Sequence, residues 1–225
     1  MAIRGKFITF EGLDGTGKST QIEKLAKALR GRGVAVVVTR EPGGTAAGEK
    51  IRQVILDSAT GGLSPLAEMA LMFASRVQHI HEVIEPALAE GKTVLCDRFT
   101  DSTEAYQGGG RKLGREAVLE LHRILCRDLW PDLTILLDSD LAASVDRARR
   151  RNRKRSSRNG RLRRDENRFE QENRNFFARV RNAYLAIARR EPERVVVVDA
   201  RGTPAATHAQ VVDVVLHKLR LPTPG

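Results

Sequence analysis

The segment from Gly12 to Ser19 carries the residues best suited to chemistry in this sequence. It reads Gly-Leu-Asp-Gly-Thr-Gly-Lys-Ser and matches the phosphate-binding loop (P-loop) pattern GxxxxGK[S/T]. Its glycines let backbone N–H groups turn toward phosphate oxygens, and the helix that begins at Lys18 adds its positive dipole end. In such a loop the lysine reaches the outer phosphates of a nucleoside triphosphate, and the serine hydroxyl binds Mg²⁺. The predicted triphosphate site comprises Gly12, Leu13, Asp14, Gly15, Thr16, Gly17, Lys18, Ser19 and Thr20.

The P-loop alone does not identify the group that accepts the phosphate, because kinases, motors, helicases and GTPases share it. Two further polar motifs follow strand-like segments. Arg40 precedes a Pro-Gly-Gly bend, where it could bind an anion, and Asp97 ends a β-branched run and could hold Mg²⁺ or its waters. A solvent-exposed turn for Arg40 and a helix cap for Asp97 are the alternative interpretations.

Short β-branched segments alternate with amphipathic segments along the chain. We expect strands at residues 7–10, 34–39, 93–97, 134–138 and 195–199. We expect helices at residues 20–30, 45–56, 65–89, 115–125, 141–151, 166–189 and 204–219. This alternation predicts an α/β protein with a doubly wound sheet of five parallel strands flanked by helices, the P-loop NTPase fold. Ligands then bind beyond the carboxyl ends of the strands, where Asp14, Arg40, Asp97 and Asp138 all fall.

Length and composition favour one domain over residues 1–225, since no Pro- or Ser-rich linker divides the chain. The first six residues lack the apolar core of a signal peptide, and no apolar run approaches the roughly 18 residues that span a bilayer. We therefore expect a cytoplasmic protein. Cys96 and Cys126 have no CxxC spacing and are predicted to be reduced packing thiols.

Most of the net charge of +11 lies in one segment, residues 147–168. That segment holds twelve Lys and Arg against Asp165 and Glu166, so it carries +10. Such a run is often a solvated face, but arginine also matches phosphate oxygens in a bidentate fashion. A P-loop protein that binds nucleic acid is therefore an alternative. No aromatic residue lies within the basic run to stack on bases, which makes this alternative weaker.

Four motifs together resemble those of bacterial thymidylate kinases. They are the P-loop, REPGGT at residues 40–45, DRF at 97–99 and AYQGGG at 105–110, and the resemblance covers nearly the whole chain. It implies transfer of a phosphoryl group from MgATP to thymidine 5′-monophosphate (dTMP), giving dTDP and ADP on the route to dTTP. It also implies a homodimer. A kinase for another nucleoside monophosphate is the nearest alternative, and a GTPase is disfavoured because no NKxD-type motif occurs.

The resemblance also implies how the acceptor phosphate and the metal are bound. It places Arg40, Arg52 and Arg98 around the phosphate of dTMP. It places Asp14 near the 3′-hydroxyl of the acceptor sugar and near the metal. The implied Mg²⁺ ligands are therefore Ser19, Asp97 and Asp14.

For the acceptor sugar and base, the resemblance places Tyr106 under the deoxyribose, where its ring leaves no room for a 2′-hydroxyl. It implies that three side chains hydrogen-bond the thymine edge: Arg76, Thr103 and Gln107.

The predicted helix at residues 65–89 would form the floor of the base pocket. On it Met72 and Phe73 precede Arg76 by four and three residues and share its face. The family usually has an aromatic residue where this chain has Met72, so either Met72 or Phe73 is expected to contact the base, and core packing is an alternative role for both.

The basic segment at residues 147–168 falls where the resembling family has its mobile lid. The P-loop has no arginine between Leu13 and Thr16, so we expect lid arginines to stabilise the charge that develops in the transition state. Arg151 and Arg168 lie at the family-matching positions and are the predicted lid arginines. The other predicted catalytic residues are Lys18, Asp14, Asp97 and Arg98.

Overall fold

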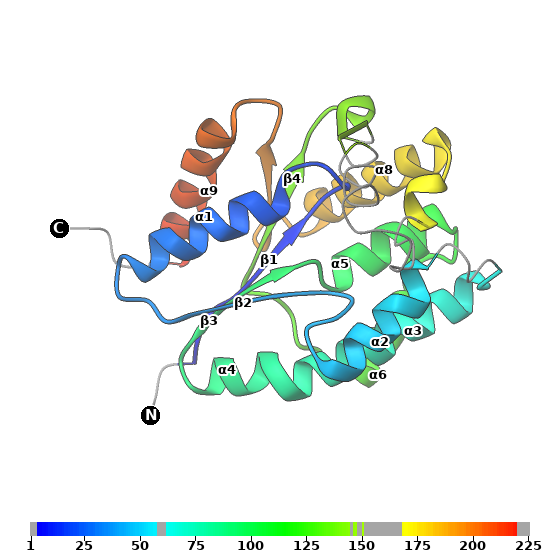
Figure 1. Ribbon diagram of the computed structural model, residues 1–225, viewed down its shortest axis with the longest axis horizontal. Coiled ribbons are helices and arrows are strands. Elements are labelled where there is room, and N and C mark those ends of the chain that lie inside the picture. The colour runs from blue at the N-terminus through cyan, green and yellow to red at the C-terminus, as the bar shows by residue number, and fades with distance from the viewer. Residues whose placement is uncertain (1–3, 58–61, 145, 148–149, 151–167, 220–225) are drawn as a thin grey trace, which may run out of the picture.

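A single parallel sheet with helices on both faces forms the framework of the protein (Figure 1). The computed structural model describes residues 4–57, 62–144, 146–147, 150 and 168–219. The strands are β1 (Phe7–Glu11), β2 (Val36–Arg40), β3 (Thr93–Asp97), β4 (Leu133–Asp138) and β5 (Val195–Asp199). They pair in the order β2-β3-β1-β4-β5, and every pairing is parallel. The predicted α/β fold with five parallel strands is confirmed.

The position of each strand in the sheet explains its residue pattern. All residues of β1 are buried, and so are nearly all those of β3 and β4, as expected of strands covered on both faces. The edge strands β2 and β5 are less buried, and Val38 and Val197 are exposed. The register pairs Phe10 of β1 with Asp97 of β3 and Arg40 of β2 with that same Asp97. The carboxyl ends of three strands therefore meet beside the P-loop.

The helices largely follow the predicted segments. They are α1 (Lys18–Arg30), α2 (Ala46–Leu56), α3 (Pro65–His79), α4 (Glu85–Ala89), α5 (Thr100–Thr103), α6 (Arg115–Leu125), α8 (Arg174–Arg190) and α9 (Pro204–Leu219). The described residues also contain two π-helical stretches, η1 (Ile80–Ile84) and η2 (Glu104–Gly110), and the 3₁₀ helix η4 (Arg168–Gln171). Local signals explain the boundaries: Ser64 accepts a hydrogen bond from the Ala67 N–H, and Pro65 occupies the first turn of α3.

Two predicted helices are interrupted, and one helical stretch was not predicted. The predicted helix at 166–189 is broken at Asn173, whose backbone is extended and whose side chain caps α8 by accepting from the Phe176 N–H. The predicted helix at 65–89 contains the π-helical turn η1 before Pro86. Residues 100–110, for which the sequence predicted no helix, form α5 and η2 because packing outweighs the low helix propensity of three glycines. The predicted helix at 141–151 lies partly outside the described residues.

The glycines of η2 permit a close approach to α8. A Cβ atom at Gly109 would lie 2.7 Å from the Ala183 Cβ, and one at Gly110 would lie 2.6 Å from the Phe176 ring. Side chains of these two elements, among them Tyr106 of η2, form one apolar cluster with Leu13 near the start of the P-loop. The absence of side chains at these glycines therefore lets η2 lie close to α8.

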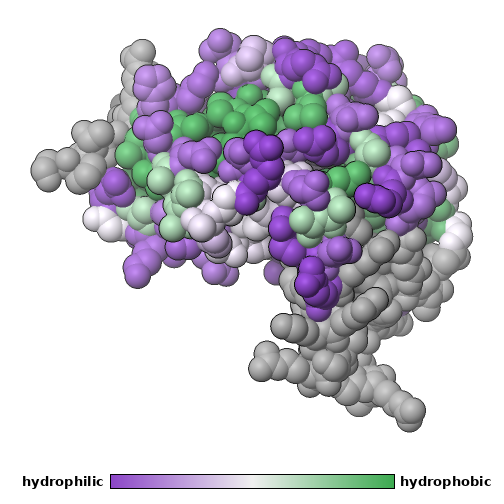
Figure 2. All heavy atoms as spheres, turned by 90° about the horizontal axis from the view of Figure 1, so that it is seen from above, coloured by the Kyte–Doolittle hydropathy of each residue, from purple (hydrophilic) through white to green (hydrophobic). Residues whose placement is uncertain are grey.

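Two further apolar clusters cover the faces of the sheet. One lies under α1 and α9 and includes Phe10, Leu25 and Val211. The other lies under α3, α4 and α6 and includes Phe7 and Phe73. Figure 2 shows hydrophilic side chains over most of the visible face, around an apolar area. Among the helices that the structure describes, none is both long enough and apolar enough to cross a membrane.

Candidate active site

The P-loop is folded around the amine of Lys18. Gly12, Gly15 and Gly17 all have positive φ angles, which non-glycine residues rarely adopt. The Lys18 Nζ donates to the carbonyl oxygens of Gly12 and Leu13, at 3.0 Å each. Burial, together with the nearby positive charge of Arg98, lowers the pKa of Lys18 to about 8. The loop thus holds a nearly buried ammonium group at the start of α1, ready to pair with an anion.

Ser19 and Asp97 form an oxygen-rich pair next to this lysine. The Ser19 hydroxyl donates to Asp97 Oδ2 over 3.0 Å. Ser19 lies in the first turn of α1, and Asp97 ends β3, so two different elements supply the oxygens. Carboxylate and hydroxyl oxygens are the donors that Mg²⁺ prefers, and the pair is accessible to solvent. These residues therefore fit a hard divalent cation.

Arg98 links the P-loop to α5, η2 and α8. Its Nη2 donates to Asp14 Oδ1 at 3.0 Å and to the Tyr106 hydroxyl at 3.3 Å. Its Nη1 donates to the hydroxyls of Ser102 and Tyr184, at 3.0 Å each. Burial opposes the charge of Arg98, but the facing Tyr106 and Asp14 raise its pKa well above the usual value. A fixed cation therefore lies beside the P-loop.

Arg76 is buried and held on several sides. Its Nε donates to Glu41 Oε2 at 2.7 Å, and its Nη2 donates to Thr103 Oγ1 at 2.9 Å. Its guanidinium carbon lies 4.9 Å from the Phe73 ring centroid and 5.1 Å from that of Phe99. Its Nη1 is buried and has no hydrogen-bond partner among the described residues. A buried unpaired donor is costly, so this atom indicates where a ligand's acceptor atom would bind.

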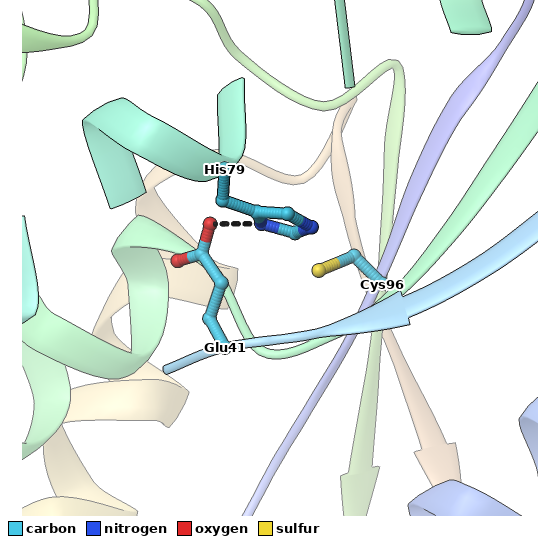
Figure 3. A group of neighbouring side chains, drawn as sticks. All are labelled: Glu41, His79 and Cys96. Carbon is cyan, nitrogen blue, oxygen red and sulfur yellow. Dashed lines mark hydrogen bonds and ion pairs between the residues drawn. The ribbon is translucent and has the colours of Figure 1, made fainter. Parts of the chain in front are cut away.

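Glu41, the carboxylate that binds Arg76, lies together with His79 and Cys96 (Figure 3). Their ligand atoms lie within 4.8 Å of one another, and these residue types can bind transition metals. Glu41 Oε1, however, lies 2.9 Å from His79 Nδ1, and His79 Nε2 lies 2.6 Å from Thr39 Oγ1. Burial by itself raises the pKa of Glu41, but Arg76 and His79 lower it by more. The net pKa lies below the usual value, so the carboxylate stays ionised. The cluster is therefore better suited to orient Arg76 than to bind a cation.

The predicted phosphate-binding arginines lie around the bend after β2. Arg40 pairs with the Glu49 carboxylate, with distances of 2.9 and 3.0 Å, and its side chain is exposed. Arg52 Nη1 donates to the Pro42 carbonyl oxygen at 3.0 Å. Both arginines therefore flank the bend, and Arg40 also neighbours Asp97 in the sheet.

Met72 and Phe73 occupy different environments, although the sequence placed both on the face of Arg76. Phe73 is fully buried and lies behind the guanidinium of Arg76, whereas Met72 is half-buried and packs against the cluster that contains Tyr106. Gln107 is also buried, but its Nε2 donates to Glu68 at 2.7 Å.

The lid residues lie only partly within the described structure. Arg151 lies outside the described residues. Arg168 is described: its Nη1 donates to the Ile55 carbonyl oxygen at 2.9 Å, and its Nη2 pairs with the buried Glu68 carboxylate. Arg147 reaches the P-loop, with Nε donating to the Gly15 carbonyl oxygen at 2.8 Å. The first residue of the predicted lid therefore contacts the P-loop, whereas Arg168 is bound on the side of α3.

Several contacts of this site involve residues that the sequence analysis did not single out. Tyr184 accepts a hydrogen bond from Arg98 and donates one to Glu11. Arg181 binds Asp138 through two bonds of 2.7 Å beside the P-loop. Asp138 was expected at a strand end, but the spacing of Arg181 and Tyr184 along α8 gave no signal of their role. The position of Glu11, at the end of a strand directly before the P-loop, could have indicated one.

Comparison with known proteins identifies relatives over nearly the whole chain. A protein-family model described as "Thymidylate kinase" matches residues 10–211. The thymidylate kinase of Trichlorobacter lovleyi is 47% identical over 216 residues, covering 96% of this chain and 99% of the relative. That of Pseudomonas fluorescens is 48% identical over 215 residues, covering 96% of each. The crystal structure of thymidylate kinase from Ehrlichia chaffeensis matches with a TM-score of 0.75 and 32% identity, covering 94% of this chain and 99% of that one.

Proposed function

Since this chain belongs to the thymidylate kinase family, we propose that it transfers the γ-phosphoryl group of ATP to dTMP, giving dTDP and ADP. The observation that carries the proposal is the position of Arg98. Its guanidinium is bound to Asp14 within the P-loop and to Tyr106 on the acceptor side. A cation between these elements can bind the acceptor phosphate while Lys18 binds the donor.

For the donor, the P-loop backbone and Lys18 would bind the phosphates of ATP. Lys18 would exchange its two loop carbonyls for phosphate oxygens, which are stronger partners for an ammonium group. Ser19, Asp97 and Asp14 would hold Mg²⁺. Two of these ligands, Ser19 and Asp97, already lie within hydrogen-bond distance of each other. When bound, Mg²⁺ would neutralise charge on the phosphate oxygens.

For the acceptor, Arg40, Arg52 and Arg98 would surround the phosphate of dTMP, and Tyr106 would pack under its sugar. Tyr106 is held edge-on by Phe169, Phe176 and Tyr184, so its ring has a fixed orientation.

For the base, Arg76 Nη1, which has no partner among the described residues, would donate to a keto oxygen of thymine. An amino group at that position would face another donor and leave both unpaired, which disfavours a cytosine base. Thr103 supports Arg76 from one side, and Met72 is the more accessible of the two neighbouring apolar residues. Gln107 would hydrogen-bond the base only after its own hydrogen bond to Glu68 is broken.

The reaction needs no protein nucleophile, because an oxygen of the acceptor phosphate attacks the γ-phosphorus directly. The protein's contribution is to align the two phosphates and to stabilise the charge that develops between them. Arg98 and Lys18 hold the two reactants from opposite sides. We infer that residues 147–168 form a lid on the single domain at 1–225, and that Arg151 and Arg168 add positive charge during transfer.

We also infer a homodimer. Val54 of α2 and Leu66 and Val77 of α3 are exposed apolar side chains on two helices that pack together. Burying them against a second copy would remove this surface from water. Light scattering coupled to size exclusion should give twice the chain mass of 24.9 kDa. The two buried free thiols, Cys96 and Cys126, support a reducing compartment such as the cytoplasm.

An assay of ADP release across the common nucleoside monophosphates tests the proposed function. We expect dTMP to give the highest kcat/KM. Preference for another monophosphate by tenfold would overturn the assignment of the acceptor. Tight, steeply salt-dependent binding to nucleic acid, with no ADP formed from dTMP, would support the nucleic-acid alternative.

A further inference from the structure

Glu11 is a fully buried carboxylate that the proposed mechanism does not use. It is the last residue of β1 and directly precedes the P-loop. Oε1 accepts from the Phe99 N–H at 2.7 Å, and Oε2 accepts from the hydroxyls of Ser102 and Tyr184 at 2.5 and 2.9 Å. A buried charge with three donors from other elements is a costly arrangement that needs all of them. Glu11 therefore connects the P-loop strand to the loop after β3 and to α8.

Both hydroxyls that donate to Glu11 also accept from Arg98. Arg98 Nη1 lies 3.0 Å from Ser102 Oγ and 3.0 Å from Tyr184 Oη. Each hydroxyl has one proton and two lone pairs. The two hydroxyl oxygens also lie 2.8 Å apart, so either hydroxyl could donate to the other instead of to Glu11. An ionised carboxylate can only accept, so it draws the protons of both hydroxyls toward itself and leaves their lone pairs for Arg98. The charge on Glu11 thus sets the direction of the hydrogen bonds that hold the guanidinium.

Glu11 also holds the backbone beside Arg98. Arg98 has a φ angle of 77°, in the left-handed region that non-glycine residues rarely adopt. Its own N–H donates to the Phe10 carbonyl oxygen at 3.0 Å, and the next N–H, of Phe99, donates to Glu11. Two consecutive bonds to the end of β1 therefore support this unfavourable conformation.

We propose that Glu11 is a positioning residue that orients Arg98 toward the acceptor phosphate, acting through Ser102, Tyr184 and the Phe99 N–H. The inference rests on the proposed function only in assigning dTMP as the acceptor. Glu11 itself does not touch a substrate. Replacing it should therefore weaken the acceptor site while the ATP site is little changed.

The charge on Glu11 provides an additional readout. Burial, with the negative charge of Asp101 nearby, raises the pKa of Glu11 to about 7, although Arg98 opposes this rise. The charge of Glu11 in turn affects the pKa values of four further groups: Lys18, Arg76, Cys96 and Tyr184. Protonated Glu11 would donate to one hydroxyl and compete with Arg98, so the affinity for dTMP should rise between pH 6 and 8. The second ionisation of the dTMP phosphate, near pH 6, is common to all variants.

The test compares Glu11→Gln with Glu104→Gln. Gln keeps the size of Glu11 but presents an amide donor to either the hydroxyls or the Phe99 N–H. Glu104 is a matched control because it is also buried, burial also raises its pKa, and it pairs with Arg190 instead of Arg98. We expect Glu11→Gln to raise the KM for dTMP about tenfold or more, with the KM for ATP within twofold. Glu104→Gln should change neither KM by more than twofold.

A double-variant cycle separates positioning from general destabilisation. Titration calorimetry with dTMP should show that Glu11→Gln weakens binding in the wild-type background but by less than twofold when Arg98 is already Ala. The rise in affinity from pH 6 to 8 should be smaller in Glu11→Gln than in the wild type. Equal losses in both backgrounds, or an unchanged KM for dTMP in Glu11→Gln, would overturn the proposal.

Tyr184→Phe and Ser102→Ala provide a second route if Glu11→Gln does not fold. Each removes one hydroxyl between Glu11 and Arg98 and leaves the carboxylate in place. We expect both to raise the KM for dTMP selectively, and no effect from either would contradict the relay. If the wild type binds another monophosphate instead of dTMP, the proposed acceptor is wrong. The same cycle with that monophosphate then still decides the role of Glu11.

Discussion

Ser19 at the start of α1 donates a hydrogen bond to Asp97 at the end of β3, with 3.0 Å between Oγ and Oδ2. The two residues are 78 positions apart in the chain, and the parallel register of β1 and β3 brings them together. Asp97 thereby faces the first turn of the helix that follows the P-loop. The nucleotide-binding side of the site is thus assembled by the sheet.

Replacing Asp97 by Asn should raise the Mg²⁺ concentration needed for half-maximal turnover about tenfold or more. A neutral amide is a weaker ligand for a hard cation than a carboxylate. Turnover measured against MgCl₂ concentration gives this value, and removal of the metal by a chelator should stop the wild-type reaction. Asp199→Asn is the matched control, since Asp199 also ends a strand but pairs with Arg201. Equal metal dependence in both variants would exclude Asp97 as a ligand.

Lys18→Ala should lower kcat/KM for ATP about 100- to 1000-fold, because the variant loses a positive charge that would stabilise the transferring phosphoryl group. Steady-state kinetics with saturating dTMP measures this. Lys24→Ala, in the same helix but exposed, should leave kcat/KM within twofold. A loss below fivefold in Lys18→Ala would show that the P-loop does not act on the phosphates as proposed.

Arg76→Lys should raise the KM for dTMP about tenfold and reduce the preference for thymine over cytosine monophosphates. Lysine cannot reproduce the planar fork that binds Glu41 and Thr103 and leaves Nη1 free. Arg194→Lys is the control, because Arg194 is also largely buried, paired with an acid and stacked on an aromatic ring. If Arg76→Lys retains the wild-type preference for thymine over cytosine, Arg76 does not select the base.

The lid hypothesis predicts that replacing both Arg151 and Arg168 by Ala lowers kcat at least tenfold. Such a contact with developing charge typically contributes several kcal/mol. Arg168 would have to leave Glu68 to reach the transferring phosphate. Single-turnover rates, with the exposed Arg123→Ala as control, measure the effect. A kcat within about threefold of wild type in the double variant would reject this assignment.

The buried imidazole of His122 should make stability depend on pH. Burial, with Arg76 nearby, lowers the pKa of His122 from 6.5 to about 4. Between these values the unfolded chain binds a proton that the native state does not, so the free energy of unfolding falls as the pH drops from 6.5 to 4. The full difference is about 3 kcal/mol. Urea unfolding of His122→Gln should lack this component, whereas the exposed His81→Gln should retain it.

The parallel sheet was predictable because its signals are local. The β-branched runs that became β1 and β3 are continuous apolar segments, and each is followed by a polar motif. Helix boundaries were less predictable where packing overrides propensity. The glycines of residues 108–110 argue against a helix, yet η2 forms because their missing side chains let it pack on α8.

The sequence by itself determined the chemistry expected of the P-loop, since Gly12, Lys18 and Ser19 lie in one short segment whose own backbone holds their groups together. Only the tertiary structure decided which distant groups support it. Glu11 and Tyr184 lie 173 positions apart, yet they share a hydrogen bond next to Arg98. No spacing or periodicity encodes such a contact, because it depends on how α8 packs against the end of the sheet. Sequence therefore named the groups expected to bind phosphate, and folding decided which buried groups lie beside them.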